Sequence, residues 1–115
     1  MGGSALGAKS IYSYFKNRIK KNVFFFDNLD QNLYSKIENV KNLNKSCFVV
    51  VSKSGNTVET IANLSVILSK KMSKNKLVVI TEMKDSALMH IANKFDAEII
   101  EYKDYIVGRY SVLSE

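Results

Sequence analysis

Side chains that could do chemistry are most concentrated between residues 47 and 60. Five apolar residues run from Cys47 to Val51, and three of them are β-branched, which predicts a strand buried on both faces. From Thr57 onward the apolar residues recur at helical spacing. The intervening loop would present free backbone N–H groups and the positive end of a helix dipole to solvent. This stretch therefore predicts a site for a phosphate or a carboxylate.

The loop also offers side-chain donors. Three hydroxyl groups and one ammonium group could contact a bound anion: Ser52, Ser54, Thr57 and Lys53. Gly55 would relieve the backbone where the loop turns. Helix capping is the alternative, with Asn56 or Thr57 as the N-cap and Glu59 near the third helical position, and it needs no ligand. Capping explains one or two of these residues but hardly all of them, so we favour a phosphate site.

A second glycine-rich stretch opens the chain, from Gly2 to Gly7. A dinucleotide-binding fingerprint would need a glycine where Ser4 stands, and a strand before it. A P-loop would need a lysine directly after Gly7, but Ala8 intervenes. The stretch is therefore interpreted as a glycine turn into a helix, which lets a ligand approach the backbone closely.

Composition restricts the function classes. The 115 residues are 46% hydrophobic and 24% charged, which is typical of one soluble globular domain. The sequence contains no run of about 18 apolar residues, which a membrane span would need. The N-terminus also lacks the basic start of a signal peptide. The net charge of +6 comes from residues 1–53, where basic side chains alternate with helical apolar positions instead of gathering with aromatic residues. We therefore expect solvated helix faces and no nucleic-acid site.

Two further reactive side chains have structural interpretations. Cys47 is the single cysteine, so no intrachain disulfide can form, and its place in a predicted strand favours a small core residue over a nucleophile. His90 is the single histidine and lies beside Leu88 and Ile91, which favours a structural or surface role. Neither residue therefore predicts a catalytic group.

Periodicity places all these residues on alternating helices and strands. Helices are predicted at 6–21, 30–43, 57–72 and in a short segment capped by Asp85 or Ser86, and strands at 23–26, 47–51, 77–81 and 97–102. The phenylalanines at 24–26 should pack in the core, and Val58, Leu64 and Ile67 should point inward. Strict alternation predicts an α/β domain whose parallel sheet is covered on both sides. Since no strand precedes the first glycine turn, we expect one domain over residues 1–115, truncated at both ends.

Three motifs occur in this order and at this spacing in glucose-6-phosphate isomerases: Gly-Gly-Ser-Ala-Leu-Gly at 2–7, Ser-Lys-Ser-Gly-Asn-Thr-Val-Glu-Thr at 52–60 and Gly-Arg-Tyr-Ser-Val-Leu-Ser at 108–114. The whole chain therefore resembles the first sugar isomerase (SIS) domain of such an enzyme. The hydroxyl-rich loop alone would indicate any SIS domain, whereas the run that begins near Arg109 is more specific to the isomerase. The family usually has two glycines before that arginine, where this chain has Val107 and Gly108. The resemblance implies a flavodoxin-like, three-layer αβα sandwich with a parallel sheet.

The resemblance also implies a reaction and a set of site residues. These enzymes interconvert glucose 6-phosphate and fructose 6-phosphate through a cis-enediol, without a metal or an organic cofactor. The family's phosphate loop matches Ser52, Lys53, Ser54 and Thr57, and its sugar-lining glycine turn matches Gly3 and Ser4. Arg109 matches the arginine that stabilises the enediolate. Glu59 matches a glutamate that contacts the ring-opening histidine, although capping of its own helix is an equally good interpretation.

The groups that move protons in this family, a base glutamate, a ring-opening histidine and a C-terminal lysine, lie beyond residue 115. We therefore expect this chain to bind a sugar phosphate without turning it over. The implied partners are a second SIS domain of the same chain and a second subunit, so the lone domain should expose apolar surface, and the implied location is the cytoplasm. Two alternatives stay open: a non-catalytic sugar-phosphate-sensing SIS module, and another SIS aldose-ketose isomerase acting on amino sugars or arabinose phosphate. The run at Arg109 argues against both.

Overall fold

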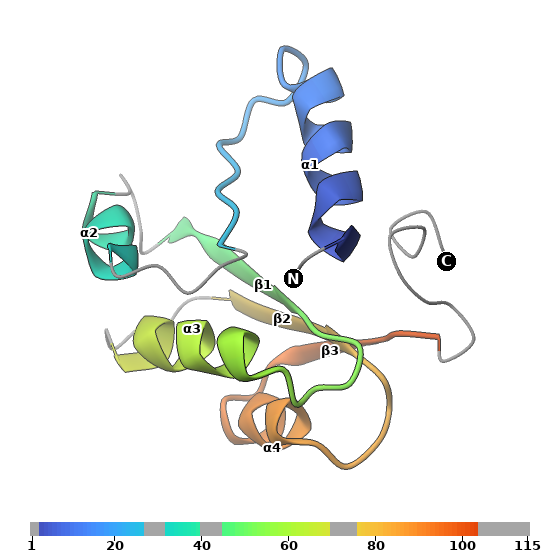
Figure 1. Ribbon diagram of the computed structural model, residues 1–115. Coiled ribbons are helices and arrows are strands. Elements are labelled where there is room, and N and C mark those ends of the chain that lie inside the picture. The colour runs from blue at the N-terminus through green and yellow to red at the C-terminus, as the bar shows by residue number, and fades with distance from the viewer. Residues whose placement is uncertain (1–2, 27–31, 40–44, 70–75, 104–115) are drawn as a thin grey trace.

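The structure, a computed structural model, describes residues 3–26, 32–39, 45–69 and 76–103 (Figure 1). In chain order its elements are α1 (Gly3–Phe15), α2 (Leu33–Glu38), β1 (Cys47–Val51), α3 (Val58–Ser69), β2 (Lys76–Thr81), α4 (Ala87–Lys94) and β3 (Glu98–Glu101). Within those residues, no helix combines the length and the hydropathy that crossing a bilayer requires.

Three parallel strands form the sheet, in the order β1-β2-β3. Val49 lies opposite Val78, and Ile80 lies opposite Ile100. α3 lies in the connection from β1 to β2, and α4 lies in the connection from β2 to β3. Parallel strands need such crossovers because a tight turn would reverse the chain direction. The predicted α/β class with a parallel sheet is confirmed, and each of these three strands begins and ends within one residue of its predicted position.

The core lies between one face of the sheet and the helices α3 and α4 (Figure 1). Its buried members come from alternate strand positions and from the inward sides of both helices: Val50, Leu64, Leu77, Val79, Leu88 and Ala92. A smaller cluster joins Ile37 of α2 to Ile67 of α3. Because the apolar residues of both crossover helices recur at helical spacing, packing one stripe of each against the sheet accounts for this burial.

The start of α3 differs from the predicted orientation. The buried residues of this helix are Thr60, Asn63, Leu64 and Ile67. Leu64 and Ile67 therefore point inward as predicted. Val58 is 73% exposed, so its predicted inward position is wrong. The reason is geometric, since Val58 lies about half a helical turn away from the buried stripe.

The opposite face of the sheet is apolar, and it is largely exposed along β1 and β3 although Val78 of β2 is buried there. Val49, Val51 and Ile100 lie on this face and keep 59%, 45% and 45% of their surface exposed. β1 is therefore not buried on both faces as predicted, because α3 and α4 both pack against the other face. Cys47, the first residue of β1, is also exposed, so the prediction that it is a core residue is wrong.

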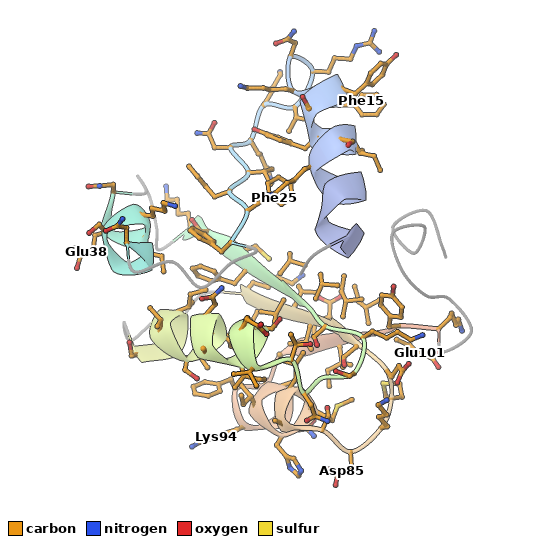
Figure 2. The ribbon with its side chains drawn as sticks, in the orientation of Figure 1. Phe15, Phe25, Glu38, Asp85, Lys94 and Glu101 are labelled. Carbon is orange, nitrogen blue, oxygen red and sulfur yellow. The ribbon has the colours of Figure 1, made fainter. Side chains whose placement is uncertain are left out.

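Residues 23–26 do not form the predicted strand, since the described sheet contains only β1, β2 and β3. Phe24 is 58% exposed. Phe25 lies on the side of its segment that faces α1, and its ring centroid is 5.9 Å from that of Tyr12 (Figure 2). Phe26 packs against the cluster of Ile37 and Ile67. The three phenylalanines thus have different surroundings. They form no strand here, because an aromatic run favours a strand only where a neighbouring strand is available.

Two helices also differ in their bounds from the prediction. α1 ends at Phe15 instead of residue 21, because the N–H groups of Arg18 and Ile19 both donate to the Phe15 carbonyl oxygen, at 2.8 and 3.0 Å, and close the helix with a turn. The structure describes α2 over Leu33–Glu38. The ends predicted at 30–31, 40–43 and 70–72 lie outside the described residues.

Candidate functional site

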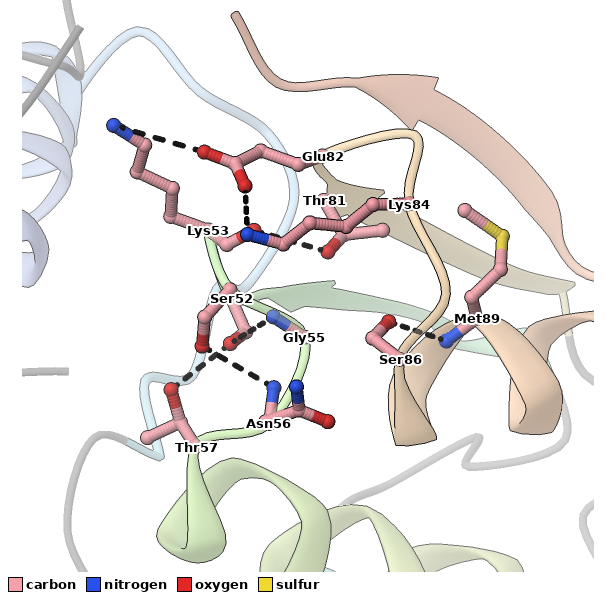
Figure 3. A network of polar contacts seen from close by, with 11 residues as sticks. Ser52, Lys53, Gly55, Asn56, Thr57, Thr81, Glu82, Lys84, Ser86 and Met89 are labelled. Atoms are coloured by element: carbon pink, nitrogen blue, oxygen red, sulfur yellow. Dashed lines mark hydrogen bonds and ion pairs between the residues drawn. The ribbon is translucent and has the colours of Figure 1, made fainter. Parts of the chain in front are cut away.

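The hydroxyl loop, residues 52–57, joins β1 to α3 at the carboxyl edge of the sheet (Figure 3). Its first residue extends the hydrogen bonding of the sheet, since the Ser52 N–H donates to the Ile80 carbonyl oxygen at 3.1 Å. The Lys53 carbonyl oxygen then accepts from the Glu82 N–H at 3.1 Å. The start of the loop is therefore held against the end of β2.

Two hydroxyl groups meet inside the hydroxyl loop. Ser52 is buried, and its Oγ accepts from the Gly55 N–H at 3.2 Å and lies 3.0 Å from Thr57 Oγ1. Either hydroxyl can donate across this pair, and with Ser52 donating, the Thr57 hydrogen stays available to a ligand. Ser54 is exposed, and its Oγ accepts from the Asn56 N–H at 3.2 Å. The Ser54 hydrogen is therefore available to a ligand as well.

At Gly55 the hydroxyl loop lies against Ser86, the residue that precedes α4. The φ of Gly55 is +71°, in the left-handed region that glycine adopts without strain. A Cβ at this position would overlap the Ser86 hydroxyl, and it would lie 2.7 Å from Ser86 Cβ and 3.1 Å from Thr81 Oγ1. Ser86 is the N-cap of α4, as one of the two predicted caps. The loop reaches the start of α4 because residue 55 has no side chain.

The hydroxyl loop closes the N-terminus of α4. The first three backbone N–H groups of this helix all have acceptors: Ala87 donates to Asn56 Oδ1 at 3.0 Å, Leu88 to the Gly55 carbonyl oxygen at 2.9 Å and Met89 to Ser86 Oγ at 3.2 Å. Unpaired N–H groups at a helix N-terminus attract anions, but these three are already bonded. The start of α4 therefore offers no anion site.

The N-terminus of α3 is open. Thr57 occupies the N-cap position, because its carbonyl oxygen accepts the first helical bond from the Ile61 N–H at 3.1 Å. In the described contacts, however, neither Thr57 nor Asn56 accepts an N–H group of α3 with its side chain. The Thr57 hydroxyl pairs with Ser52, and the Asn56 side chain accepts from the Ala87 N–H of α4. The same contacts give no acceptor to the N–H groups of residues 58–60. The arrangement differs from the capping alternative and leaves three N–H groups for an anion.

Glu82 brings two lysines together beside the hydroxyl loop (Figure 3). Lys53 Nζ lies 3.7 Å from Glu82 Oε1, and Lys84 Nζ is bonded to Glu82 Oε2. The hydrogen bond from Lys84, supported by the positive charges of both lysines, lowers the pKa of the Glu82 carboxyl. Sequence reasoning missed Glu82, although one signal was present. Glu82 follows the strand predicted at 77–81, and the carboxyl ends of parallel neighbours meet at one edge of the sheet.

The other predicted site residues are placed only in part. Gly3 and Ser4 begin α1, and the start of α1 is the end of that helix nearer the sheet (Figure 1). Glu59 lies in the first turn of α3 and is exposed. Arg109 lies outside the described residues. His90 is on the surface of α4, and no group of three His, Cys, Asp or Glu side chains in the described part of the chain could hold a metal ion.

Replacing Asn56 by alanine removes the acceptor for the Ala87 N–H. We expect the free energy of unfolding to fall by about 1 kcal/mol, the usual effect of losing a side-chain cap, and urea denaturation measures it. Asn56→Asp is the matched control, because it keeps an acceptor oxygen and adds a negative charge at the N-terminus of α4, so it should retain wild-type stability. Equal stability of the alanine variant and the wild type would show that Asn56 does not cap α4.

Curated proteins similar to this chain include glucose-6-phosphate isomerases. The family model described as phosphoglucose isomerase matches residues 1–115. Glucose-6-phosphate isomerase of Borreliella burgdorferi (strain ZS7) is 38% identical in an alignment of 126 residues that covers 99% of this chain and 23% of that protein. Glucose-6-phosphate isomerase of Methanocaldococcus jannaschii is 36% identical over 118 residues, which cover 99% of this chain and 29% of that protein.

A solved structure is similar as well. The crystal structure of hypothetical protein TT0462 from Thermus thermophilus matches with a TM-score of 0.81 and 26% identity, over 97% of this chain and 28% of that chain. This chain spans about a quarter of the length of the curated relatives named above. The resemblance inferred from the three motifs is confirmed: the chain belongs to the phosphoglucose isomerase family.

Proposed function

We propose that this chain is the sugar-phosphate-binding part of a glucose-6-phosphate isomerase and that the hydroxyl loop holds the phosphate. The open N-terminus of α3 carries the proposal, because the described contacts give no acceptor to its first three backbone N–H groups. The neighbouring N-terminus of α4 is closed, so one of two adjacent helix ends is left for an anion. The names of the relatives suggest the class of that anion, a sugar phosphate, and the family match favours this function over a sensor module or another sugar isomerase.

Side chains of the hydroxyl loop would add to these N–H groups. Thr57 can donate to a phosphate oxygen when Ser52 donates to it, so buried Ser52 would act by orienting Thr57. The exposed Ser54 hydroxyl can donate in the same way. Lys53 would add its positive charge after leaving Glu82. Because the phosphate is charged, each of these hydrogen bonds would be stronger than one between neutral groups.

For the complete protein, the proposed reaction is the interconversion of glucose 6-phosphate and fructose 6-phosphate through a cis-enediol. Arg109 would stabilise the enediolate, and Gly3 and Ser4 would line the sugar. Glu59 would contact a ring-opening histidine or cap its own helix. A second SIS domain and a second subunit would supply the groups that move protons, in the cytoplasm and without a metal or an organic cofactor. This chain alone would therefore bind the sugar phosphate without isomerising it.

The proposed function predicts which ligands stabilise the chain. Fructose 6-phosphate and inorganic phosphate should raise the melting temperature, whereas unphosphorylated fructose should leave it unchanged. Combining Ser54→Ala with Thr57→Ala should weaken the binding of fructose 6-phosphate by at least about 10-fold, because a hydrogen bond to a charged group contributes about 1.5–3 kcal/mol. Thermal-shift titrations of both proteins with the three ligands measure these effects.

The matched control for this double variant is Ser65→Ala. Ser65 is an exposed serine on α3 whose hydroxyl donates to the Ile61 carbonyl oxygen, one turn or more beyond the open end of the helix. The control should shift with phosphate as the wild type does. Equal shifts for the wild type and the double variant would remove the case for the hydroxyl loop as the phosphate site. Isomerase activity of the purified chain would contradict the proposal that proton transfer needs groups outside it.

A further inference from the structure

The carboxylate of Glu82 lies at the hydroxyl loop, although the proposed function gives it no role. Glu82 directly follows β2, and its backbone N–H donates to the Lys53 carbonyl oxygen at 3.1 Å. Its side chain is only 13% exposed. The end of β2 therefore sets the position of Glu82, and the carboxylate places a negative charge beside the hydroxyl loop.

Two lysines share this carboxylate unequally. Lys84 Nζ is in direct contact with Glu82 Oε2, whereas Lys53 Nζ lies 3.7 Å from Oε1, beyond the roughly 2.7–2.9 Å of a direct charge-assisted hydrogen bond. The pair with Lys53 is therefore the weaker of the two. In Figure 3 the Lys53 side chain extends toward Glu82 and away from Thr57, the N-cap residue that precedes α3. The lysine expected to contact phosphate thus points toward a carboxylate instead.

We propose that Glu82 is a positioning residue that limits the affinity of the hydroxyl loop for phosphoryl groups, because it holds Lys53 away from the open end of α3. The inference rests on the proposed function and adds to it a residue that sets the affinity. A phosphate dianion at the N–H groups of residues 58–60 would attract Lys53 more strongly than a carboxylate that Lys84 already neutralises. Lys53 would then leave Glu82 for the phosphate, and Lys84 would stay behind on the carboxylate.

The test is a calorimetric titration of the full 115-residue chain with inorganic phosphate and with fructose 6-phosphate. Glu82→Gln keeps the shape of the side chain and removes its charge, so we expect it to bind both ligands about 3- to 10-fold more tightly than the wild type. Glu98→Gln is the matched control. Glu98 also pairs with a lysine, Lys76 at 2.9 Å, but both residues begin their strands and lie at the opposite edge of the sheet. This control should change the affinity by less than about 2-fold, because solvent and salt screen a distant charge.

A second measurement separates this charge effect from a structural one. If Glu82 acts through Lys53, then adding Glu82→Gln to Lys53→Met should change phosphate affinity by less than about 2-fold, because no ammonium group is left to hold at residue 53. An undirected loosening of the loop would change the affinity equally in both backgrounds. A gain in affinity from Glu82→Gln that is present with Lys53 and lost in the Lys53→Met background therefore supports the inference.

Each failure has its own pattern. Phosphate binding by the wild type with the same affinity in Glu82→Gln and Glu98→Gln would overturn the role of Glu82 and leave the phosphate site standing. Weaker binding by Glu82→Gln, or the same gain in affinity with and without Lys53, would also overturn it. Absence of phosphate binding by the wild type and by Glu82→Gln would overturn the proposed phosphate site itself, and this inference with it.

Discussion

Replacing Gly55 by alanine should lower the free energy of unfolding by about 2–4 kcal/mol, one of the two largest effects that we expect. Gly55 has a φ of +71°, and a left-handed backbone conformation costs a residue with a side chain about 1–2 kcal/mol. The new methyl group would also overlap the Ser86 hydroxyl and lie 2.7 Å from Ser86 Cβ. The hydroxyl loop or α4 would therefore have to move. Urea denaturation of the variant and the wild type measures the loss.

The backbone and steric causes can be separated at Ser86. Ser86→Gly removes the colliding side chain, and glycine at an N-cap costs only a few tenths of a kcal/mol relative to serine. In this background Gly55→Ala should cost about 1–2 kcal/mol, mainly the backbone contribution, because only the 3.1 Å contact with Thr81 Oγ1 remains. An equal loss in both backgrounds would show that the contact with Ser86 contributes nothing. A Gly55→Ala variant as stable as the wild type would contradict the described conformation of the loop.

Replacing Leu88 by alanine should lower the free energy of unfolding by about 2–5 kcal/mol, the range for a fully buried leucine. Leu88 is 0% exposed and packs in the cluster that α4 forms with the sheet. Its backbone N–H also donates to the Gly55 carbonyl oxygen at 2.9 Å, so one residue joins the core to the hydroxyl loop. The substitution leaves this backbone bond possible and empties the space of the side chain. Urea denaturation again measures the difference.

Val58→Ala is the control for lost apolar atoms. Val58 is also on a helix next to the hydroxyl loop, but it is exposed, so removing its methyl groups should change the free energy of unfolding by no more than about 0.5 kcal/mol. A loss below about 1 kcal/mol for Leu88→Ala would contradict the described packing of α4 on the sheet.

The strands show what an apolar run can predict. The run 77–81 and the run 47–51 look alike in the sequence, and both form parallel strands where they were expected. β2 lies in the centre of the sheet and buries Leu77, Val78 and Val79 in succession. β1 lies at the edge, and Val49 is exposed between half-buried Phe48 and buried Val50. An apolar run in the sequence identifies residues that can be buried, whereas the neighbouring strands and helices decide how many of these residues are covered.

In the candidate site, too, some features follow from the local sequence and others depend on tertiary contacts. The strand, the hydroxyl loop and the helix follow one another in the chain, so local pattern was enough to predict that an anion could bind there. Asn56 caps α4 and Lys53 pairs with Glu82, and both partners are about 30 residues further along the chain. Residues so far apart meet only after β1 and β2 have paired, so no local pattern could predict these two contacts.

The sequence by itself determined the three parallel strands, the two helices that connect them and the family, and it predicted the loop that could receive a phosphate, because periodicity, turn chemistry and family motifs depend on neighbours in the chain. The tertiary structure alone decided which helix end stays open, since the loop closes α4 and leaves the N–H groups of residues 58–60 without an acceptor among the described contacts. It also decided where the Lys53 ammonium points, because parallel pairing places Glu82 beside it. These outcomes depend on groups brought together by the sheet, and their partners are distant in the sequence.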